Sequence, residues 1–290
     1  MTRIYDCTSD SNTSESDYAA HIELAKLAIA RGDLVVIPTD TVYGVAADAF
    51  NAEAVQRLLD AKGRGRTSPP PVLIPAVTTL DALAIDVPQP VRDLVAAFWP
   101  GGLTVIVNAQ PSLVWDLGET RGTVALRMPS NQIALDLLSE TGPLAVSSAN
   151  LSGSPAATNV HSSQGALGES IDVYLDGGPA GSTYGSAFDF AIDEQPDAVE
   201  SEASPGANSS TIIDASGFST NGGFLHIVRS GVISRDAIAA VVGDVLAAAP
   251  AIPGVAASSG ASVEIVEDAS IPTIVAPSAE DAPPEEDASR

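Results

Sequence analysis

Short apolar segments alternate with amphipathic segments along most of the chain. Residues 34–37, LVVI, form a continuous apolar run after a Gly-Asp turn, which is typical of a buried strand in an α/β sheet. The same pattern predicts further strands at residues 72–74, 103–107, 123–129, 144–146, 173–175, 209–214 and 224–229, the last two paired. Because helical spacing lies between them, we predict an α/β fold: a single domain with a twisted, open, mixed sheet and flanking helices.

Helices are predicted where apolar residues recur every three or four positions. The first begins at Ser16 or Asp17 and stops at Gly32. The second is capped by Asn51 and ends near residue 62. Others are predicted at residues 90–98, 132–140 and from Ser234 onward, while residues 81–87 fit either a helix or a loop.

Composition sets both ends and one internal segment apart from the α/β pattern, which covers residues 16–246. Residues 1–15 are polar and predict a flexible N-terminus or a short edge segment. Residues 182–208 hold six acidic residues and no basic one, which predicts a mobile surface insertion. Residues 247–290 hold eight acidic residues, one basic residue and no aromatic one, which predicts a disordered tail.

The whole chain is strongly acidic, with a net charge of -24 from 37 acidic and 13 basic residues. Tight binding to a nucleic-acid backbone needs basic faces, so this balance weighs against it. Cys7 is the only cysteine, which excludes an intrachain disulfide and favours a reducing compartment. No apolar run approaches the ~20 residues of a membrane span and no signal-peptide pattern begins the chain, so we expect a soluble cytoplasmic protein without membrane contact.

Three of the basic residues fall within five positions at the end of the second predicted helix, in the segment Lys62-Gly63-Arg64-Gly65-Arg66. Cations at a helix C-terminus complement its macrodipole, which stabilises the helix by about 0.3–1 kcal/mol. One cation is enough for that effect, and glycines are not needed. The segment therefore favours a polyphosphate clamp, in which the glycines let the backbone approach an anion and the cations neutralise its oxygens.

Polar side chains follow two of the predicted strands. Thr39, Asp40 and Thr41 come shortly after the strand at 34–37, and Ser147 and Ser148 follow the strand at 144–146. In open α/β sheets ligands bind beyond the carboxyl ends of the strands, so the two clusters predict a shared cleft. Each hydroxyl could equally satisfy a local backbone group.

The usual phosphate-binding and nucleophile motifs are absent. The chain has no G-x-x-x-x-G-K-[ST], no G-x-G-x-x-G between a strand and a helix, and no G-x-S-x-G. The three histidines have no metal-ligand spacing, so no dedicated metal site is expected. The remaining hydroxyls, amide and cations suit a site that holds a polyanion beside a small polar substrate and catalyses by positioning and charge neutralisation.

Eight short motifs occur in the order known from one protein family. They are PTDTVYGV (38–45), KGR (62–64), WPGGLT (99–104), TVALRMP (123–129), SSANLSG (147–153), LDGG (175–178), SSTIID (209–214) and VRSG (228–231). Over roughly residues 16–246 the chain resembles the Sua5/YciO/YrdC family, in a short form without the additional C-terminal domain of longer members. The resemblance implies a YrdC-like fold and L-threonylcarbamoyladenylate synthesis, a nucleotidyl transfer that makes threonylcarbamoyl-AMP and pyrophosphate from L-threonine, bicarbonate and ATP for tRNA modification.

The resemblance also assigns roles to individual residues. For L-threonine they are Thr41, Arg127, Ser148 and Ser210. For ATP they are Lys62, Arg64, Ser68, Thr123, Asn150, Thr158 and Arg229, with Lys62 and Arg64 acting in catalysis through the charge they bring to the phosphates. A Mg²⁺ would arrive with ATP, without a dedicated protein site. The nucleophile would be the carboxylate of N-carboxythreonine, so no protein nucleophile is needed.

The implied partners are the three small substrates and a tRNA threonylcarbamoyl-transferase complex that takes the product, with weak or no direct tRNA binding. Two alternatives share the fold: a non-catalytic nucleotide- or RNA-binding protein, and another carbamoyl-transfer enzyme. Arg127 distinguishes L-threonylcarbamoyladenylate synthesis from another carbamoyl-transfer reaction, because a guanidinium fork implies a substrate carboxylate. The chain also departs from the family pattern at Gly65 and Arg66, where a proline is common, at Asn131, where a histidine is common, and at Ser230 within R-S-G.

Overall fold

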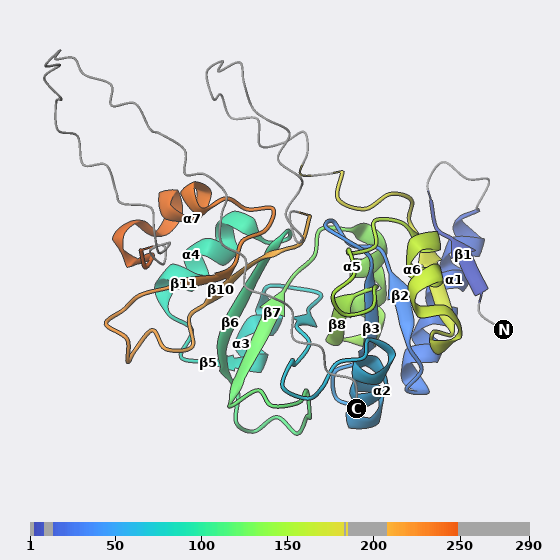
Figure 1. Ribbon diagram of the computed structural model, residues 1–290, viewed down its shortest axis with the longest axis horizontal. Coiled ribbons are helices and arrows are strands. Elements are labelled where there is room, and N and C mark those ends of the chain that lie inside the picture. The colour runs from blue at the N-terminus through green and yellow to red at the C-terminus, as the bar shows by residue number, and fades with distance from the viewer. Residues whose placement is uncertain (1–2, 9–13, 183, 185–207, 249–290) are drawn as a thin grey trace, which may run out of the picture. The chain divides into compact units, whose positions relative to one another are not determined.

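A mixed, open β-sheet runs through the centre of the fold (Figure 1). The computed structural model describes residues 3–8, 14–182, 184 and 208–248. Within these residues eleven strands form one sheet in the order β1-β9-β2-β3-β8-β4-β7-β6-β10-β11, with β5 paired to β6 outside that path. The predicted mixed, open α/β sheet is therefore confirmed.

The strands are β1 (Arg3–Asp6), β2 (Val35–Ile37), β3 (Gly44–Asp48), β4 (Val72–Leu73), β5 (Ala84–Ile85), β6 (Leu103–Ala109), β7 (Thr123–Arg127), β8 (Leu144–Ser148), β9 (Val173–Asp176), β10 (Thr211–Asp214) and β11 (His226–Arg229). The helices are α1 (Glu15–Ala30), α2 (Ala52–Ala61), α3 (Thr78–Leu83), α4 (Gln89–Phe98), α5 (Gln132–Thr141), α6 (Val160–Leu167) and α7 (Arg235–Val242). Short 3₁₀ turns follow α6 and α7, at Gly168–Ser170 and Gly243–Val245.

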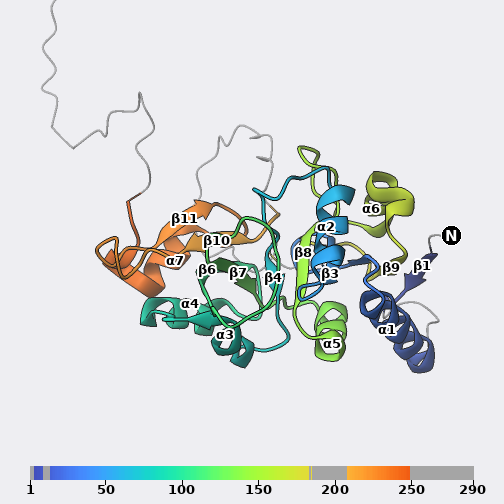
Figure 2. The same ribbon diagram turned by 90° about the horizontal axis from the view of Figure 1, so that it is seen from below.

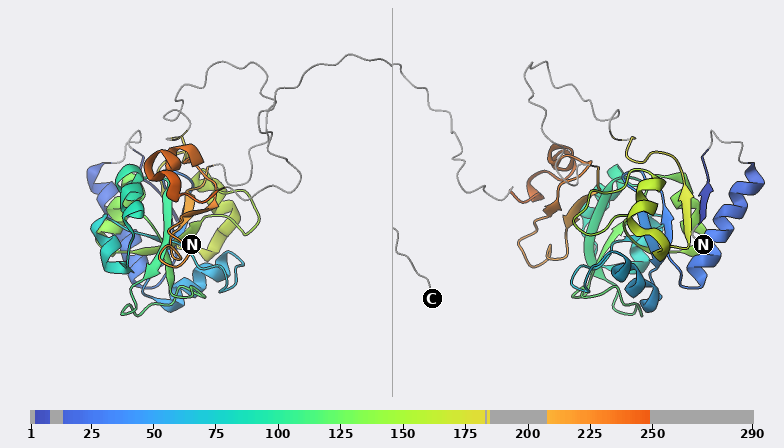
Figure 3. Two further views of the ribbon diagram at one scale, coloured as in Figure 1. Left: turned by 90° about the vertical axis from the view of Figure 1, so that its left-hand side faces the viewer. Right: turned by 45° about the vertical axis from the view of Figure 1, so that its right-hand side comes forward.

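Helices cover the sheet in three groups, each built on its own cluster of buried apolar side chains. α1 and α5 pack on one face of β2 and β3, and α2 and α6 pack on the opposite face (Figure 2). α3, α4 and α7 pack against β6 and β7, with α7 beside α4 (Figure 3). Alternation along β6 directs Leu103, Val105 and Val107 into this last cluster, so Thr104 faces the other side of the sheet.

The sheet changes direction at β4. This strand pairs antiparallel with β8 but parallel with β7, so β7 and β8 run in opposite directions. Gly44, at the start of β3, lies opposite both Ile37 at the end of β2 and Ser148 at the end of β8. The carboxyl ends of β2 and β8 therefore lie on either side of Gly44. The strand β7 runs antiparallel to both, so its carboxyl end points in the opposite direction.

Side-chain caps fix most helix starts. Asn51 accepts hydrogen bonds from the amides of Glu53 and Ala54, and Ser234 caps α7, as predicted. The start of α1 was predicted at Ser16 or Asp17, and this is wrong by two to three residues. Ser14 is the cap, because its hydroxyl accepts the Asp17 amide while the Asp17 carboxylate accepts the Ser14 amide in a capping box.

Two elements were missed by the sequence pattern. β3 consists of Gly, Val, two Ala and Asp, which are mostly poor strand formers, and it is held by pairing with β2 and β8 on either side. α6 has no strong apolar period and begins at the cap Asn159. The ambiguous segment at 81–87 divides into the end of α3, strand β5 and a turn.

The segments set apart by composition are only partly described. Arg3–Asp6 forms the edge strand β1, paired with β9, which agrees with the short edge segment considered for the N-terminus. Of residues 182–208 the structure describes Ser182, Tyr184 and Asn208, and residues 249–290 of the predicted tail lie outside the described part. None of the described helices has the length and apolar composition needed to span a membrane.

Candidate functional site

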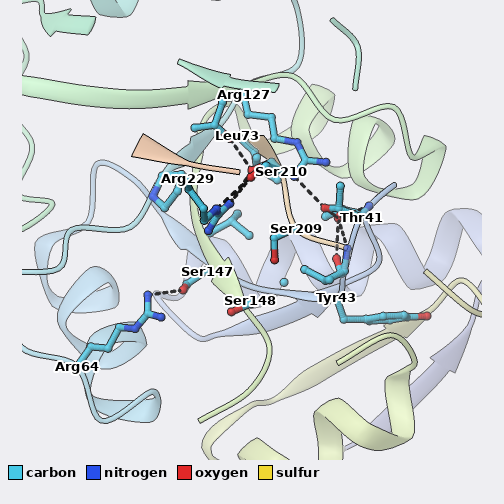
Figure 4. Close-up of a pocket in the computed structure, with 16 residues that line it drawn as sticks. Thr41, Tyr43, Arg64, Leu73, Arg127, Ser147, Ser148, Ser209, Ser210 and Arg229 are labelled. Carbon is cyan, nitrogen blue, oxygen red and sulfur yellow. Dashed lines mark hydrogen bonds between the residues drawn. The ribbon is translucent and has the colours of Figure 1, made fainter. Parts of the chain in front are cut away.

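A pocket of about 600 Å³, including the space at its open mouth, lies over the sheet between the β2–β3–β8 part and the β4–β7–β6–β10 part (Figure 4). Its apolar wall includes Pro71, Leu73 and Val146. Its polar lining consists of Thr39, Thr41, Arg64, Thr104, Arg127, Ser147, Ser148, Ser209, Ser210 and Arg229, together with Tyr43.

The two polar clusters predicted to share a cleft do so. Thr39 and Thr41 beyond β2, and Ser147 and Ser148 at the end of β8, all line the pocket. Gly44 lies between them, and a Cβ at this position would come within 2.6 Å of Val146 Cγ1, so only glycine fits without a shift. Close packing of β3 on β8 therefore brings the two clusters together.

Arg127 joins the pocket from β7, which runs opposite to β8. Its guanidinium is buried and donates from Nε to Gly101 O at 2.9 Å, from Nη1 to Thr41 Oγ1 at 2.9 Å, and from Nη2 to Asp40 Oδ1 at 2.7 Å. Asp40 is thus its ion-pair partner, with 2% of its side chain exposed. Arg127 is held from three sides and is still one of the residues that line the pocket.

Arg229, at the end of β11, is fixed by Ser210, the residue before β10. It donates from Nε and Nη2 to Ser210 O at 3.0 and 2.8 Å, and from Nη2 to Ser210 Oγ at 2.8 Å. Ser210 Oγ is also 2.8 Å from Thr104 Oγ1. Surrounding protein atoms, and then the positive charges of Arg127 and Arg64, lower the pKa of Arg229. Arg64, Arg127 and Arg229 all line the same pocket.

The structure places the three cations of the predicted clamp in different surroundings. Arg64 lines the pocket and donates to Ser152 Oγ at 2.9 Å and Ser147 Oγ at 3.3 Å. Arg66 instead points to the loop after β6, where it pairs with Asp116 at 2.6 Å. Gly65 and Arg66 turn the chain away from the pocket, so only one of the three cations faces it.

Lys62 is buried beneath the pocket and does not border it. Its ammonium donates to the carbonyls of Ser148 and Asn150, and its own carbonyl accepts the Ser152 amide at 3.2 Å. Burial, and then the nearby charge of Arg64, lower the pKa of Lys62 to about 8. In this position Lys62 braces the segment that carries Ser148 and Asn150, and its contact with phosphate stays a prediction.

The other predicted ATP residues do not border this pocket. Thr123 stands at the start of β7, four residues or about 13 Å along the strand from Arg127. Ser68 is exposed in the turn after Arg66, and Thr158 accepts the Ala180 amide through its carbonyl. Asn150 is buried, and its Oδ1 lacks a hydrogen-bond partner within the described residues. That orphaned acceptor is the feature best suited to a ligand donor.

Tyr43, Thr104, Tyr184 and Ser209 lie at or near the pocket and were not singled out from the sequence, whereas Asp40 and Ser147 belong to the polar clusters that were. Tyr43, Thr104 and Ser209 lie inside the quoted motifs, so the motifs were a usable signal for them. Asp40 and Tyr184 act from behind the lining, and Tyr184 Oη donates to Asp40 Oδ2 at 2.7 Å. Tyr184 falls in the acidic insertion, where no motif pointed to it. Trp99 is a core aromatic, buried and bonded through Nε1 to Leu103 O.

The lining defines what the site can do chemically. It offers three guanidiniums and several hydroxyls, and no carboxylate among the described residues that line it. Such a pocket binds anions and positions them, and it holds no evident general base. Within the described part of the chain, no three His, Cys, Asp or Glu residues group closely enough to hold a metal ion.

Comparison with known proteins identifies the family. A family model named Sua5_yciO_yrdC, with the description "Telomere recombination", matches residues 27–196. The chain belongs to the Sua5/YciO/YrdC family. A Mycobacterium tuberculosis H37Rv protein named putative threonylcarbamoyl-AMP synthase is 41% identical over 243 residues, which cover 84% of this chain and 96% of that protein. The Bacillus subtilis threonylcarbamoyl-AMP synthase is 37% identical over 179 residues, 61% of this chain and 50% of its own length.

Solved structures agree with the fold. The structure of Pyrococcus abyssi Sua5 complexed with L-threonine superposes with a TM-score of 0.68 at 28% identity, covering 84% of this chain and 62% of that one. Escherichia coli YciO superposes with a TM-score of 0.60 at 19% identity, covering 79% of this chain and 96% of that one, and supports the fold alone.

Proposed function

We propose that this protein is a threonylcarbamoyl-AMP synthase, a nucleotidyltransferase that converts L-threonine, bicarbonate and ATP to threonylcarbamoyl-AMP and pyrophosphate. The observation that carries the proposal is the convergence of Arg64, Arg127 and Arg229 on one hydroxyl-lined pocket in a chain with only 13 basic residues against 37 acidic ones. Relatives that bear this activity in their names match most of the chain, and a threonine-bound relative shares its fold.

The lining divides into two chemical parts that suit the two larger substrates. Arg127, Thr41 and Ser210 would hold L-threonine, because Arg127 still has N–H groups for a carboxylate and the hydroxyls can bond its polar groups. Arg64 and Arg229 would face the phosphates of ATP, since neither forms an ion pair within the described residues. Ser148 lines the same pocket next to Ser147 (Figure 4).

Catalysis would come from positioning and charge. The carboxylate of N-carboxythreonine would attack the α-phosphorus, and the bond from that phosphorus to the β-phosphate bridging oxygen would break. The arginines would stabilise the negative charge that builds on the α-phosphate and the departing pyrophosphate. A Mg²⁺ bound by the ATP phosphates would neutralise further charge. Lys62 would keep Ser148 and Asn150 in place beneath the substrates.

The product is a mixed anhydride of a carbamic acid and AMP, which water hydrolyses readily. It therefore suits immediate transfer to tRNA by a threonylcarbamoyl-transferase complex. The acidic character of this chain supports a hand-off of the small molecule over a direct grip on tRNA, because phosphate contacts require basic surface.

Carbon labelling tests the reaction directly. The purified protein is incubated with ¹³C-bicarbonate, L-threonine and ATP, and the quenched mixture is analysed by mass spectrometry. We expect threonylcarbamoyl-AMP carrying one labelled carbon, and at least about a hundredfold less of it from Arg127→Met. Absence of the labelled product from the wild-type protein, while ATP still binds, would contradict the proposal.

A further inference from the structure

Arg127 uses three of its five N–H groups to hold its own position. Nε bonds Gly101 O, and one N–H on each terminal nitrogen bonds Thr41 or Asp40. One N–H therefore remains on each of Nη1 and Nη2 for an anion in the pocket. The direction of these two donors depends on what fixes the plane of the guanidinium.

Asp40 is the acidic group that fixes this plane. It lies behind the pocket lining, and its Oδ1 accepts from Arg127 Nη2 at 2.7 Å and from the Ser130 amide at 3.0 Å. Its other oxygen, Oδ2, accepts from Tyr184 Oη at 2.7 Å. Both carboxylate oxygens thus have donors, so the carboxylate cannot rotate without losing a hydrogen bond in a buried place.

Tyr184 supports Arg127 on two sides. Besides bonding Asp40, its ring end packs on the turn at Gly101 and Gly102, where a Cβ would come within 3.0 and 3.1 Å of its hydroxyl. Gly101 supplies the carbonyl that accepts Arg127 Nε. Burial, and then the charge of Asp40, raise the pKa of the Tyr184 phenol, so it remains a donor at neutral pH.

We propose that Asp40 and Tyr184 are positioning residues that orient Arg127 for the carboxylate of the amino-acid substrate. The inference rests on the proposed function and deepens it. Neither residue borders the pocket, so each acts through Arg127. The contact also ties a described residue of the acidic insertion to the substrate site, across 144 positions of sequence.

The ion pair with Asp40 also distinguishes Arg127, which suits the substrate carboxylate, from Arg64 and Arg229, which suit the phosphates. Of the three pocket arginines, Arg127 alone forms an ion pair with a described residue. Its charge is already balanced, so it suits a single carboxylate held by directed hydrogen bonds. Arg64 and Arg229 keep unbalanced charge, which suits the triphosphate. Loss of the Asp40 charge should therefore weaken amino-acid binding without weakening ATP binding.

The test uses Tyr184→Phe, which removes one hydroxyl and keeps the ring. Tyr18→Phe is the matched control, because Tyr18 Oη also donates to a carboxylate, that of Asp136, at 2.6 Å and away from the pocket. Calorimetry measures binding of L-threonine, L-threoninamide and ATP to each protein. We expect Tyr184→Phe to weaken L-threonine binding about tenfold and ATP binding less than twofold, and to reduce the preference for L-threonine over the uncharged amide.

Tyr18→Phe should leave all three affinities unchanged. Asp40→Asn, which keeps the shape and removes the charge, should weaken L-threonine binding further and leave ATP binding equal or tighter. Equal loss for both ligands, or Tyr184→Phe binding like the wild type, would overturn the positioning role. Failure of the wild-type protein itself to bind L-threonine would instead contradict the proposed function, so the two failures are distinguishable.

Discussion

Lys62 and Arg64 are separated by one glycine, yet the structure gives them different surroundings. Lys62 is 1% exposed and its ammonium is held by two backbone carbonyls, whereas Arg64 is partly exposed and lines the pocket. The KGR motif contains both cations and gives no sign that their roles differ. Side-chain direction separates them, because the helix ends at Ala61 and Gly63 adopts a positive φ of 63° that redirects the chain before Arg64.

Paired substitutions should separate these two roles. Lys62→Met leaves the Ser148 and Asn150 carbonyls without their donor, and we expect a loss of about 1–3 kcal/mol in the free energy of unfolding together with weak activity. Arg64→Met should change the unfolding free energy by less than about 0.5 kcal/mol but weaken ATP binding at least about tenfold. Urea denaturation and ATP titration measure the two effects. A Lys62→Met protein as stable as the wild type would contradict the bracing role.

The same lysine predicts a pH dependence of stability. The pKa of Lys62 falls from its ordinary 10.5 to about 8 in the folded protein. Between these values the unfolded chain binds more protons, so the wild type should gain stability relative to Lys62→Met as pH rises through this range, and the difference should stay constant below it. Urea denaturation of both proteins at pH 7 and pH 9 tests the sign. If the stability difference between wild type and Lys62→Met is smaller at pH 9 than at pH 7, the folded protein favours the charged form of Lys62, which contradicts the prediction.

The sequence identified much of the pocket lining and missed Tyr184, which supports Arg127 through Asp40. Thr41, Arg127, Ser148, Ser210 and Arg229 all border the pocket, as the motif positions suggested. Tyr184 carried no signal, because its contact with Asp40 depends on how a segment 144 residues away folds back over the sheet. Such contacts follow from three-dimensional packing, which periodicity along one segment does not encode.

At the scale of elements, β3 shows why the strand pattern was incomplete. Its sequence, Gly-Val-Ala-Ala-Asp, has weak strand propensity, and pairing with both β2 and β8 holds it in the sheet. The expectation that polar residues gather at the carboxyl ends of strands was right for β2 and β8. It does not explain Arg127, because the reversal at β4 depends on hydrogen-bond pairing that no local pattern reveals.

Gly44 is the position where this strand packing determines the pocket. In Gly44→Ala the new methyl group would lie 2.6 Å from Val146 Cγ1, so we expect a loss of about 1–3 kcal/mol in stability and weaker substrate binding. The added Val146→Ala substitution should relieve the clash. In a double-mutant cycle, Gly44→Ala should therefore cost less in the Val146→Ala background than in the wild type. Equal costs in both backgrounds would contradict the proposed close approach of β3 and β8.

For the whole molecule, the last described residues of the chain take part in the fold. Leu246 is buried and bridges Leu225, and Ala247 bonds Leu225 O through its amide and Arg235 through its carbonyl. The chain therefore makes specific contacts through Ala247, one residue beyond the end of the domain predicted from the sequence. Residues 249–290 lie outside the described part, and their composition still predicts disorder.

Two truncations locate this boundary. A protein that ends after Ala248 keeps these contacts, and we expect its melting temperature and activity to match those of the full chain. A protein that ends after Val245 loses the buried Leu246 side chain and both Ala247 bonds, and should lose about 1.5–3 kcal/mol of stability from the leucine alone. Differential scanning calorimetry measures both. A large loss on cutting after Ala248 would show that the remaining residues support the fold.

The distribution of charge over the molecule concentrates three arginines in one pocket of an acidic chain. The chain carries a net charge of -24, yet the three arginines of its pocket meet no acidic lining residue within the described part. Overall composition weighed against tight nucleic-acid binding but did not indicate a concentrated cationic pocket. The fold creates that pocket by bringing together arginines from the segment after α2, from β7 and from β11, which are far apart in sequence.

The most direct test of the central claim is pyrophosphate release from ATP by the purified full-length protein, with L-threonine and bicarbonate each present or omitted. We predict release only when both are present, because the attacking carboxylate forms from the two together. Release without L-threonine would show simple ATP hydrolysis, and no release under any condition, with ATP bound, would show a binding protein on the same fold. Either result would contradict the assignment of this pocket to threonylcarbamoyl-AMP synthesis.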